Sequence, residues 1–200
     1  AYAMAGLWKK DYTAWIPEAQ TWVLTGVFVL GLGIMMGAYW AYETLNFGGY
    51  WNWDPVENAV YVPWLIMVAA AHGMLIYRKK GVALKSVYVL VVLSFLLILY
   101  STFLTRSGIL GDASVHSFTD LGLSGQLLIY LLAFVIFAVV LMWVRWKELP
   151  SGEIDSSWKG ANFWIFLGIG ILCLAGFQII MGTSLPVFNA IKGLFGEPGK

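Results

Sequence analysis

Between two long apolar segments, the chain reads Phe47-Gly-Gly-Tyr-Trp-Asn-Trp-Asp-Pro-Val-Glu-Asn58. The two glycines near the start of this stretch let the backbone bend tightly, because glycine has no side chain to restrict it. Three aromatic side chains follow within four positions, those of Tyr50, Trp51 and Trp53. The stretch therefore predicts a compact aromatic loop between two helices.

The end of the same stretch predicts the start of a helix. Asp54 suits the N-cap position and Pro55 the first helical position, while Glu57 can reach back to the backbone and complete a capping box. We expect this helix to run from Pro55 through Tyr77, with a kink at Pro63, where a backbone N–H is missing. The indoles that precede it are then held on a stiff ledge, which suits a large, flat, apolar ligand.

The composition is that of a membrane protein. Of the residues, 60% are hydrophobic and 12% are charged, and the mean hydropathy is +0.77. A helix needs about 20 apolar residues to cross the hydrocarbon core of a bilayer, and five segments approach that length: Thr21–Trp40, Ala59–Tyr77, Val82–Leu104, Gln126–Trp143 and Ala161–Met181. We therefore expect an all-α membrane protein, with residues 1–200 forming a single domain of about five transmembrane helices.

Several classes of function lack the residues they need. The net charge is +1 and no basic run carries interleaved aromatic residues outside the membrane flanks, so no nucleic acid partner is expected. The sequence has no glycine-rich phosphate loop, no HExxH motif and no series of acidic residues within the predicted spans. Hydrolysis and proton-driven transport are therefore not predicted.

The fourth and fifth predicted spans have the features of a scaffold. Neither carries a charge in its core, and the lone cysteine, Cys173, is expected to be a small core residue that rules out any disulfide within the chain. Gly168, Gly170 and Gly176 are expected at close contacts between helices.

The basic residues predict how the chain lies in the membrane. Nine of the 12 fall on one side of the predicted spans, which by the positive-inside tendency is the cytoplasm: Lys9, Lys10, Arg78, Lys79, Lys80, Lys85, Arg145, Lys147 and Lys159. The Trp-rich loop 47–58, the loop 105–125 and the tail after Gly182, expected as an outer loop, then face the extracytoplasmic side. Residues 1–7 resemble the end of another apolar helix, and we expect a chain cut from a longer protein.

The aromatic residues of the outer surface allow two interpretations. Trp and Tyr gather at the lipid head groups of many membrane proteins as an interfacial belt, and Trp40 and Trp64 fit such a belt. Trp51 and Trp53 favour a ligand surface, because they lie together beside a Gly-Gly turn and a capped helix start, whereas a belt scatters its rings around the rim.

His72 is an ionisable residue inside the second predicted span, which makes it a functional candidate. Three alanines precede it and Gly73 follows, so small side chains leave room beside the imidazole for a planar group or another helix. The alternative is a neutral histidine bonded to a neighbouring helix. At a rise of about 1.5 Å per residue, His72 lies about 27 Å from Asp54, so one ligand cannot contact both.

His116 lies in the loop after the third predicted span, on the same face as Trp51 and Trp53. It is a candidate ligand for a group bound at the aromatic ledge, and Arg106 is near enough in sequence to pair with a carboxylate of that group. The alternatives are an inert loop histidine and an arginine that snorkels at the helix end.

These motifs together resemble a known family. The run Gly48–Asn58 is similar to the WWD signature of the haem-handling protein family, and specifically to the CcmF family of cytochrome c maturation haem lyase subunits. The similarity continues through Pro63-Trp64-Leu65 to His72, and it resumes at Thr102–Gly108 and Ser114–Phe118. It covers essentially the whole chain and is weak in the last two predicted helices.

The resemblance implies two haem sites. In that family the Trp-rich loop forms an outer platform for haem, which here would be shaped by Trp51, Trp53, Tyr50 and Asp54. His116 matches a loop histidine that ligates the outer haem iron, and Arg106 is placed to pair with a propionate. His72 matches a membrane histidine that ligates the iron of a second haem, a haem b thought to supply reducing equivalents.

The resemblance also implies partners and a location. The family lies in the bacterial inner (cytoplasmic) membrane, with its Trp-rich loop on the extracytoplasmic side. It receives haem from a haem chaperone and joins it to the CxxCH cysteines of apocytochrome c, together with other cytochrome maturation subunits. The implied reaction is thioether bond formation, for which this chain would position the porphyrin and would supply no catalytic nucleophile.

This sequence departs from the family pattern in two ways. Phe47 stands where the family commonly has Trp, and His72 and His116 are the only histidines, so one further histidine at each site has no counterpart. Two other functions stay open: a haem exporter or relay that passes haem to a chaperone without forming bonds, and a structural membrane module. The residues Pro55–Asn58 favour the lyase, because related exporters typically lack that continuation.

Overall fold

The computed structural model describes residues 1–45, 48–111, 113–114, 122–150, 152 and 160–196, and these form seven α-helices and no strand. The helices are α1 (Tyr2–Lys9), α2 (Trp15–Thr44), α3 (Pro55–Lys80), α4 (Leu84–Arg106), α5 (Ser124–Arg145), α6 (Ala161–Thr183) and α7 (Leu185–Leu194). Five of them, α2 to α6, are long and apolar enough to cross a membrane. The predicted all-α membrane fold is confirmed. Four of the predicted spans lie within α2, α3, α5 and α6, while the third, Val82–Leu104, begins two residues before α4.

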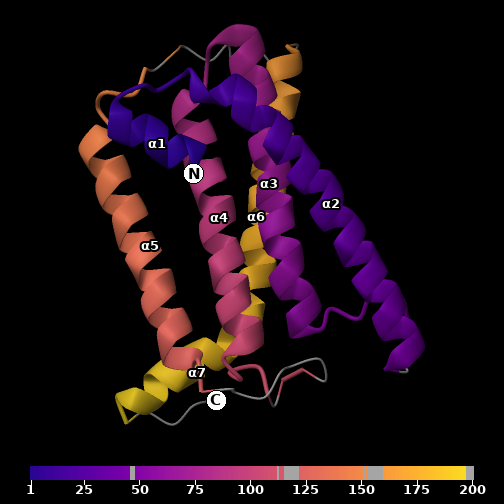
Figure 1. Cartoon of the computed structure of the whole chain (residues 1–200). Coiled ribbons are helices and arrows are strands. Elements are labelled where there is room, and N and C mark those ends of the chain that lie inside the picture. Colours follow the sequence, from indigo (N-terminus) through magenta and orange to yellow (C-terminus); the bar gives the residue numbers. More distant parts are fainter. Residues whose placement is uncertain (46–47, 112, 115–121, 151, 153–159, 197–200) are drawn as a thin grey trace.

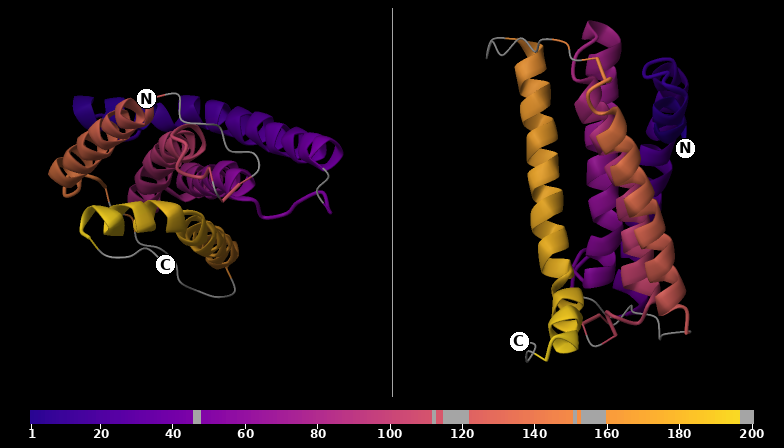
Figure 2. Two further views of the ribbon diagram at one scale, coloured as in Figure 1. Left: turned by 90° about the horizontal axis from the view of Figure 1, so that it is seen from below. Right: turned by 90° about the vertical axis from the view of Figure 1, so that its left-hand side faces the viewer.

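Helix α3 lies at the centre of the bundle. It packs against α4, α6 and α2, while α5 contacts α4 at the far side and α2 leans outward (Figure 1). Figure 2 shows the same arrangement from below, with α3 and α4 enclosed between α2, α5 and α6. The Trp-rich loop therefore leads directly into the most enclosed helix of the structure.

Small side chains bring α3 close to its neighbours. A Cβ added at Gly73 would lie 3.4 Å from Val87 Cγ2 of α4, and one at Gly176 of α6 would lie 3.4 Å from Ile66 Cδ1. Such close approach is typical of membrane helices. The expectation for Gly176 is confirmed, but Gly168 and Gly170 have no atom within 4 Å of an added Cβ, so they make no close helix contact within the described residues.

The ends of two elements differ from the expected ones. Helix α3 continues through Pro63 and beyond Tyr77 to Lys80, where Gly81 ends it in a left-handed conformation with φ 69°. The tail after Gly182 is helical, which corrects the expected outer loop: α7 begins immediately after Ser184 and crosses the lower end of the bundle (Figure 1). Its Val187 packs on the apolar cluster around Leu110, which stabilises this helix.

A polar cluster fixes the basic end of the bundle, by which we mean the end that carries Arg78–Lys80 and Arg145. Trp15 Nε1 donates to the Tyr88 hydroxyl at 2.7 Å, and Tyr88 in turn donates to the Tyr12 carbonyl at 3.1 Å. The Tyr12 hydroxyl donates to Glu148, just after α5. These bonds join the connection between α1 and α2 to α4 and α5 at the end opposite the Trp-rich loop.

Candidate functional site

The start of α3 has the predicted capping box. Asp54 is the N-cap, and its side chain accepts a hydrogen bond from the Val56 backbone N–H at 3.1 Å. Glu57 Oε2 accepts from the backbone N–H groups of Asp54 at 3.2 Å and Asn52 at 3.0 Å. The Glu57 carboxylate on the helix is therefore bonded to backbone N–H groups of the Trp-rich loop on both sides of Trp53.

The backbone of Trp53 is in an unusual conformation for a residue with a side chain. Its φ is +56°, in the left-handed region, which costs energy for any residue other than glycine. The Asn58 side-chain amide donates to the Trp53 carbonyl at 2.9 Å and holds this turn. The Trp53 side chain is 59% exposed, so a strained backbone holds a large apolar ring away from the core.

The aromatic rings form a connected series along the start of α3. Trp51 lies edge-on to Trp53 at 6.1 Å between centroids with an interplanar angle of 88°, and it also packs on Tyr61 at 5.4 Å. Tyr61 stacks on Trp64 at 5.7 Å. Because the two indoles are perpendicular, a flat ligand cannot stack on both of them at once.

Tyr50 and Trp53 face different neighbours. The Tyr50 hydroxyl donates to the Met35 carbonyl at 2.8 Å, and its ring lines a cavity of about 400 Å³ with side chains of α2. Trp53 instead lines a cavity of about 570 Å³ with α6. The Trp-rich loop thus borders two cavities, and the structure does not bring Tyr50 and Trp53 to the same one.

The loop after α4 is attached to the start of α3. The Ser114 hydroxyl donates to Asp54 Oδ1 at 2.6 Å, and both residues are buried. This bond brings residue 114 to the N-cap of α3. Two residues of the predicted site environment, His116 and Phe47, lie outside the described residues. Arg106 is the last residue of α4 and its side chain is exposed.

His72 lies on an exposed face of α3. Its Nδ1 is 2.8 Å from the Val68 carbonyl oxygen, one turn earlier. Because a carbonyl only accepts, Nδ1 is the donor, and in the neutral imidazole the lone pair is then on Nε2. A backbone bond of this kind fixes the ring and the tautomer of histidines that ligate metals.

The three alanines before His72 do not surround the imidazole, which corrects the expectation from the sequence. Ala69, Ala70 and Ala71 are buried, and the first two pack with Ile66 and Leu90. They serve the close packing of α3, while His72 points away from them. The imidazole bonds within its own helix, so the alternative of a histidine bonded to a neighbouring helix is also wrong for the described residues.

His72, the candidate iron ligand that the structure describes, belongs to no cluster of potential metal ligands. Within the described ranges, no three His, Cys, Asp or Glu side chains come together in a way that could hold a metal ion. His72 offers a single ring nitrogen, Nε2.

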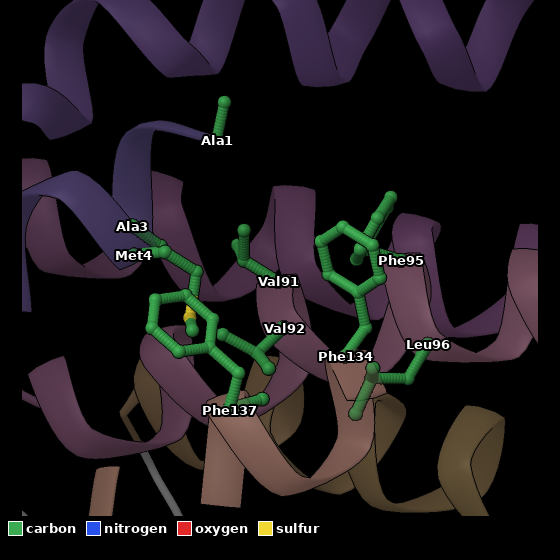
Figure 3. A pocket seen from close by; sticks show the side chains of 10 residues that line it. Ala1, Ala3, Met4, Val91, Val92, Phe95, Leu96, Phe134 and Phe137 are labelled. Carbon is green, nitrogen blue, oxygen red and sulfur yellow. The ribbon is translucent and has the colours of Figure 1, made fainter. Parts of the chain in front are cut away.

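A further cavity, of about 330 Å³, lies between α1, α4 and α5. Phe95, Phe134 and Phe137 line it together with aliphatic side chains (Figure 3). Its lining side chains are all apolar, so none is available to orient a polar group of a ligand. We do not count this cavity as part of the candidate site.

The roles of two residues of the site environment escaped the sequence analysis. Ser114 was noted only as the first residue of the family motif Ser114–Phe118, and its bond to Asp54 was not expected, because the bond depends on the folded arrangement of two helix ends. Gln178 lies on α6, which was expected to be scaffold, and it lines the cavity beside Trp53. Its signal was available, since it is a side-chain amide in the second half of an apolar span, whereas the other amide, Asn162, lies at the start.

The fold and the site define a class of protein: an integral membrane bundle of α-helices with a capped Trp-rich loop at one end. The family model described as "Cytochrome C assembly protein" matches residues 9–110, and the chain belongs to that family. It is 35% identical to the cytochrome c-type biogenesis protein CcmF of Pseudomonas fluorescens over 96% of this chain and 29% of that protein. It is 38% identical to the cytochrome c-type biogenesis protein CycK of Rhizobium meliloti, over 96% of this chain and 29% of that protein.

A solved structure has the same fold. The cytochrome c haem lyase CcmF matches with a TM-score of 0.71 and 28% identity, over 98% of this chain and 30% of that one. The predicted resemblance to the CcmF family is therefore confirmed. The chain spans about 30% of the length of these relatives.

Proposed function

We propose that this chain binds haem for its covalent attachment to apocytochrome c during c-type cytochrome biogenesis. The observation that carries the proposal is the hydrogen bond between Ser114 and Asp54 at 2.6 Å. It connects the segment that leads to His116 with the capped helix start that holds Trp53. The Trp-rich loop and residue 114, two positions before His116, thus meet at one end of the bundle.

The described residues at this end suit a porphyrin. An exposed indole offers a stacking face, and the cavity beside it is within the size range of small-molecule sites. Trp53 would stack on the ring and Trp51 would support the Trp53 indole edge-on, while Asp54 and Glu57 keep the loop in shape. Haem supplies the vinyl groups to which the cysteine thiols of a CxxCH segment add.

His116 and Arg106 complete the proposed outer site. His116 is the proposed axial ligand, on the strength of the family resemblance, and Arg106 at the end of α4 is the proposed partner of a propionate. The chain would hold and orient the porphyrin. Holding two reactants in the correct relative position is itself a large contribution to rate.

His72 is the proposed ligand of a second haem, of b type, within the membrane. The bond from Nδ1 to the Val68 carbonyl leaves Nε2 as the coordinating atom and points it outward from α3. Because the chain has only two histidines, ligation of either iron by two imidazoles requires a histidine from another part of the protein or from a partner.

The proposed setting is the bacterial cytoplasmic membrane, with the Trp-rich loop on the extracytoplasmic side. The basic end of the bundle, with Arg78, Lys79 and Lys80, would face the cytoplasm. The proposed partners are a haem chaperone that delivers haem, an apocytochrome with a CxxCH segment, and other maturation subunits.

The test is the yield of mature c-type cytochrome in cells that depend on this protein. Trp53→Ala is expected to lower that yield and the haem content of the purified protein, because the stacking face is lost. Trp164→Ala is the matched control, since Trp164 is also 59% exposed but lies near the start of α6. Normal cytochrome assembly in Trp53→Ala would refute the proposal.

A further inference from the structure

The cavity beside Trp53 has walls from two distant parts of the chain. Its lining residues are Trp53, Pro55 and Asn58 from the start of α3, and Ala175, Gln178, Ile179, Gly182 and Thr183 from α6. Its volume is about 570 Å³. In the views of Figures 1 and 2, α6 runs beside α3 and reaches the end of the bundle that carries the Trp-rich loop.

Most of this wall is apolar and shaped for a flat body. The Trp53 ring, Pro55 and Ile179 supply apolar surface, while Ala175 and Gly182 leave space between them. A Cβ added at Gly182 would have no atom within 4 Å. The cavity therefore has room for one edge of a planar ring that stacks on the Trp53 indole.

Two amide groups of this wall have a hydrogen-bonding atom without a partner. Asn58 Oδ1 is buried and has no donor among the described residues. Gln178 makes no hydrogen bond within the same ranges, although it lies in a membrane-spanning helix, where an unpaired amide is costly. Thr183 differs, because its hydroxyl donates to the Ile179 carbonyl at 2.9 Å. Because Asn58 Oδ1 is buried and Gln178 is exposed, the Gln178 amide is the group of this wall that is left over for a ligand.

We propose that this cavity seats the propionate edge of the outer porphyrin and that the Gln178 amide donates a hydrogen bond to a propionate. The inference rests on the proposed function, because it takes haem to be the ligand at Trp53. Gln178 lies about 8 Å from the end of α6 at a rise of about 1.5 Å per residue, at the depth where a carboxylate still reaches the polar interface. Holding this edge leaves the vinyl edge accessible to the apocytochrome.

The experiment titrates ferric protoporphyrin IX into the full chain in lipid nanodiscs and follows absorbance. Gln178→Leu is expected to raise the dissociation constant about tenfold to a hundredfold, the contribution of one hydrogen bond to a charged group. The dimethyl ester of the same porphyrin, which has no carboxylates, is expected to bind both proteins equally. Asn162→Leu, which removes an amide near the other end of α6, is the matched control and should change neither titration.

A second pair of variants tests the cavity itself. Gly182→Phe places a ring in the cavity and is expected to weaken binding of both porphyrins at least tenfold, whereas Gly170→Phe, in the same helix with equal space, should not. Normal binding in both Gln178→Leu and Gly182→Phe, with binding lost in Trp53→Ala, would overturn this inference and leave the proposed function standing. Normal binding in Trp53→Ala, or no binding by the unmodified chain, would overturn both.

Discussion

The Ser114 hydroxyl and the Asp54 carboxylate are joined by a buried hydrogen bond of 2.6 Å, although 60 residues separate them in sequence. Asp54 Oδ1 also accepts from the Val56 backbone at the first turn of α3. One carboxylate oxygen therefore caps the central helix and anchors the segment that follows α4. The loop that carries His116 begins at the same point as the helix that follows the Trp-rich loop.

Replacing Ser114 by Ala should loosen this connection. The buried carboxylate loses a donor, which typically costs about 1–3 kcal/mol, so the melting temperature and the affinity for haem should both fall. Ser114→Thr keeps the hydroxyl and should retain most of both. Ser94→Ala is the control, because the Ser94 hydroxyl bonds to a carbonyl of its own helix. Equal stability and haem affinity in Ser114→Ala and the unmodified protein would show that the bond does not anchor the loop.

Asp54→Ala removes the N-cap and the acceptor for Ser114 at once. Loss of an N-cap costs about 1 kcal/mol, and loss of the buried bond adds to it, so we expect a larger loss of stability than in Ser114→Ala. The free energy of unfolding, measured for both single variants and the double variant, gives their coupling. Strictly additive losses would mean that the two residues act independently.

His72→Ala should remove a b-type haem signal and leave the fold intact, since the imidazole is exposed and bonds to its own helix. The measurement is a reduced-minus-oxidised absorbance spectrum of the purified protein, with Leu75→Ala, on the same exposed face, as control. An unchanged spectrum in His72→Ala would exclude His72 as an iron ligand.

His116→Ala should lower the amount of mature c-type cytochrome while the level of the protein itself holds. The physical reason is the loss of the proposed axial ligand at the outer site. Reduced-minus-oxidised spectra of the single His72 and His116 variants should each lack a different haem absorbance signal. The loss of one and the same signal in both would mean a single haem site.

The contact between Tyr12 and Glu148 should make stability depend on pH. The hydrogen bond from Tyr12, followed by that from Arg145, lowers the pKa of Glu148 below its ordinary value of 4.5. The stabilisation of the folded protein by the ionised Glu148 carboxylate is therefore present above pH 4.5 and is lost as the pH falls through the lowered pKa. At pH 7 we expect the unmodified protein to have a higher melting temperature than Tyr12→Phe. In acid this difference in melting temperature should vanish. Because both groups are exposed to solvent, the difference should be small. A constant difference down to low pH would contradict the assignment.

The sequence predicted the features that depend on local chemistry. The spans followed from the length of the apolar segments, and the cap of α3 followed from the order Asp54, Pro55 and Glu57, since each interaction lies within one turn. The motifs around His72 and the Trp-rich loop were sufficient to identify the family.

The features that arise between distant segments were not predictable in the same way. The bond from Ser114 to Asp54 and the wall that α6 contributes beside Trp53 depend on how helices pack, and neither has a local pattern. The positive φ of Trp53 was missed because the preceding glycines suggested that they would form the turn. Helix α7 was missed because the tail after Gly182 was expected to be an outer loop, whereas Pro186 lies in the first turn of a helix.

The most direct test of the central claim is a structure of the protein with haem bound. The account predicts that the porphyrin plane stacks on the Trp53 indole, with one edge in the cavity between Trp53 and α6. A haem bound elsewhere, with the Trp53 indole directed into lipid and the His116 side chain turned away from the site, would contradict it.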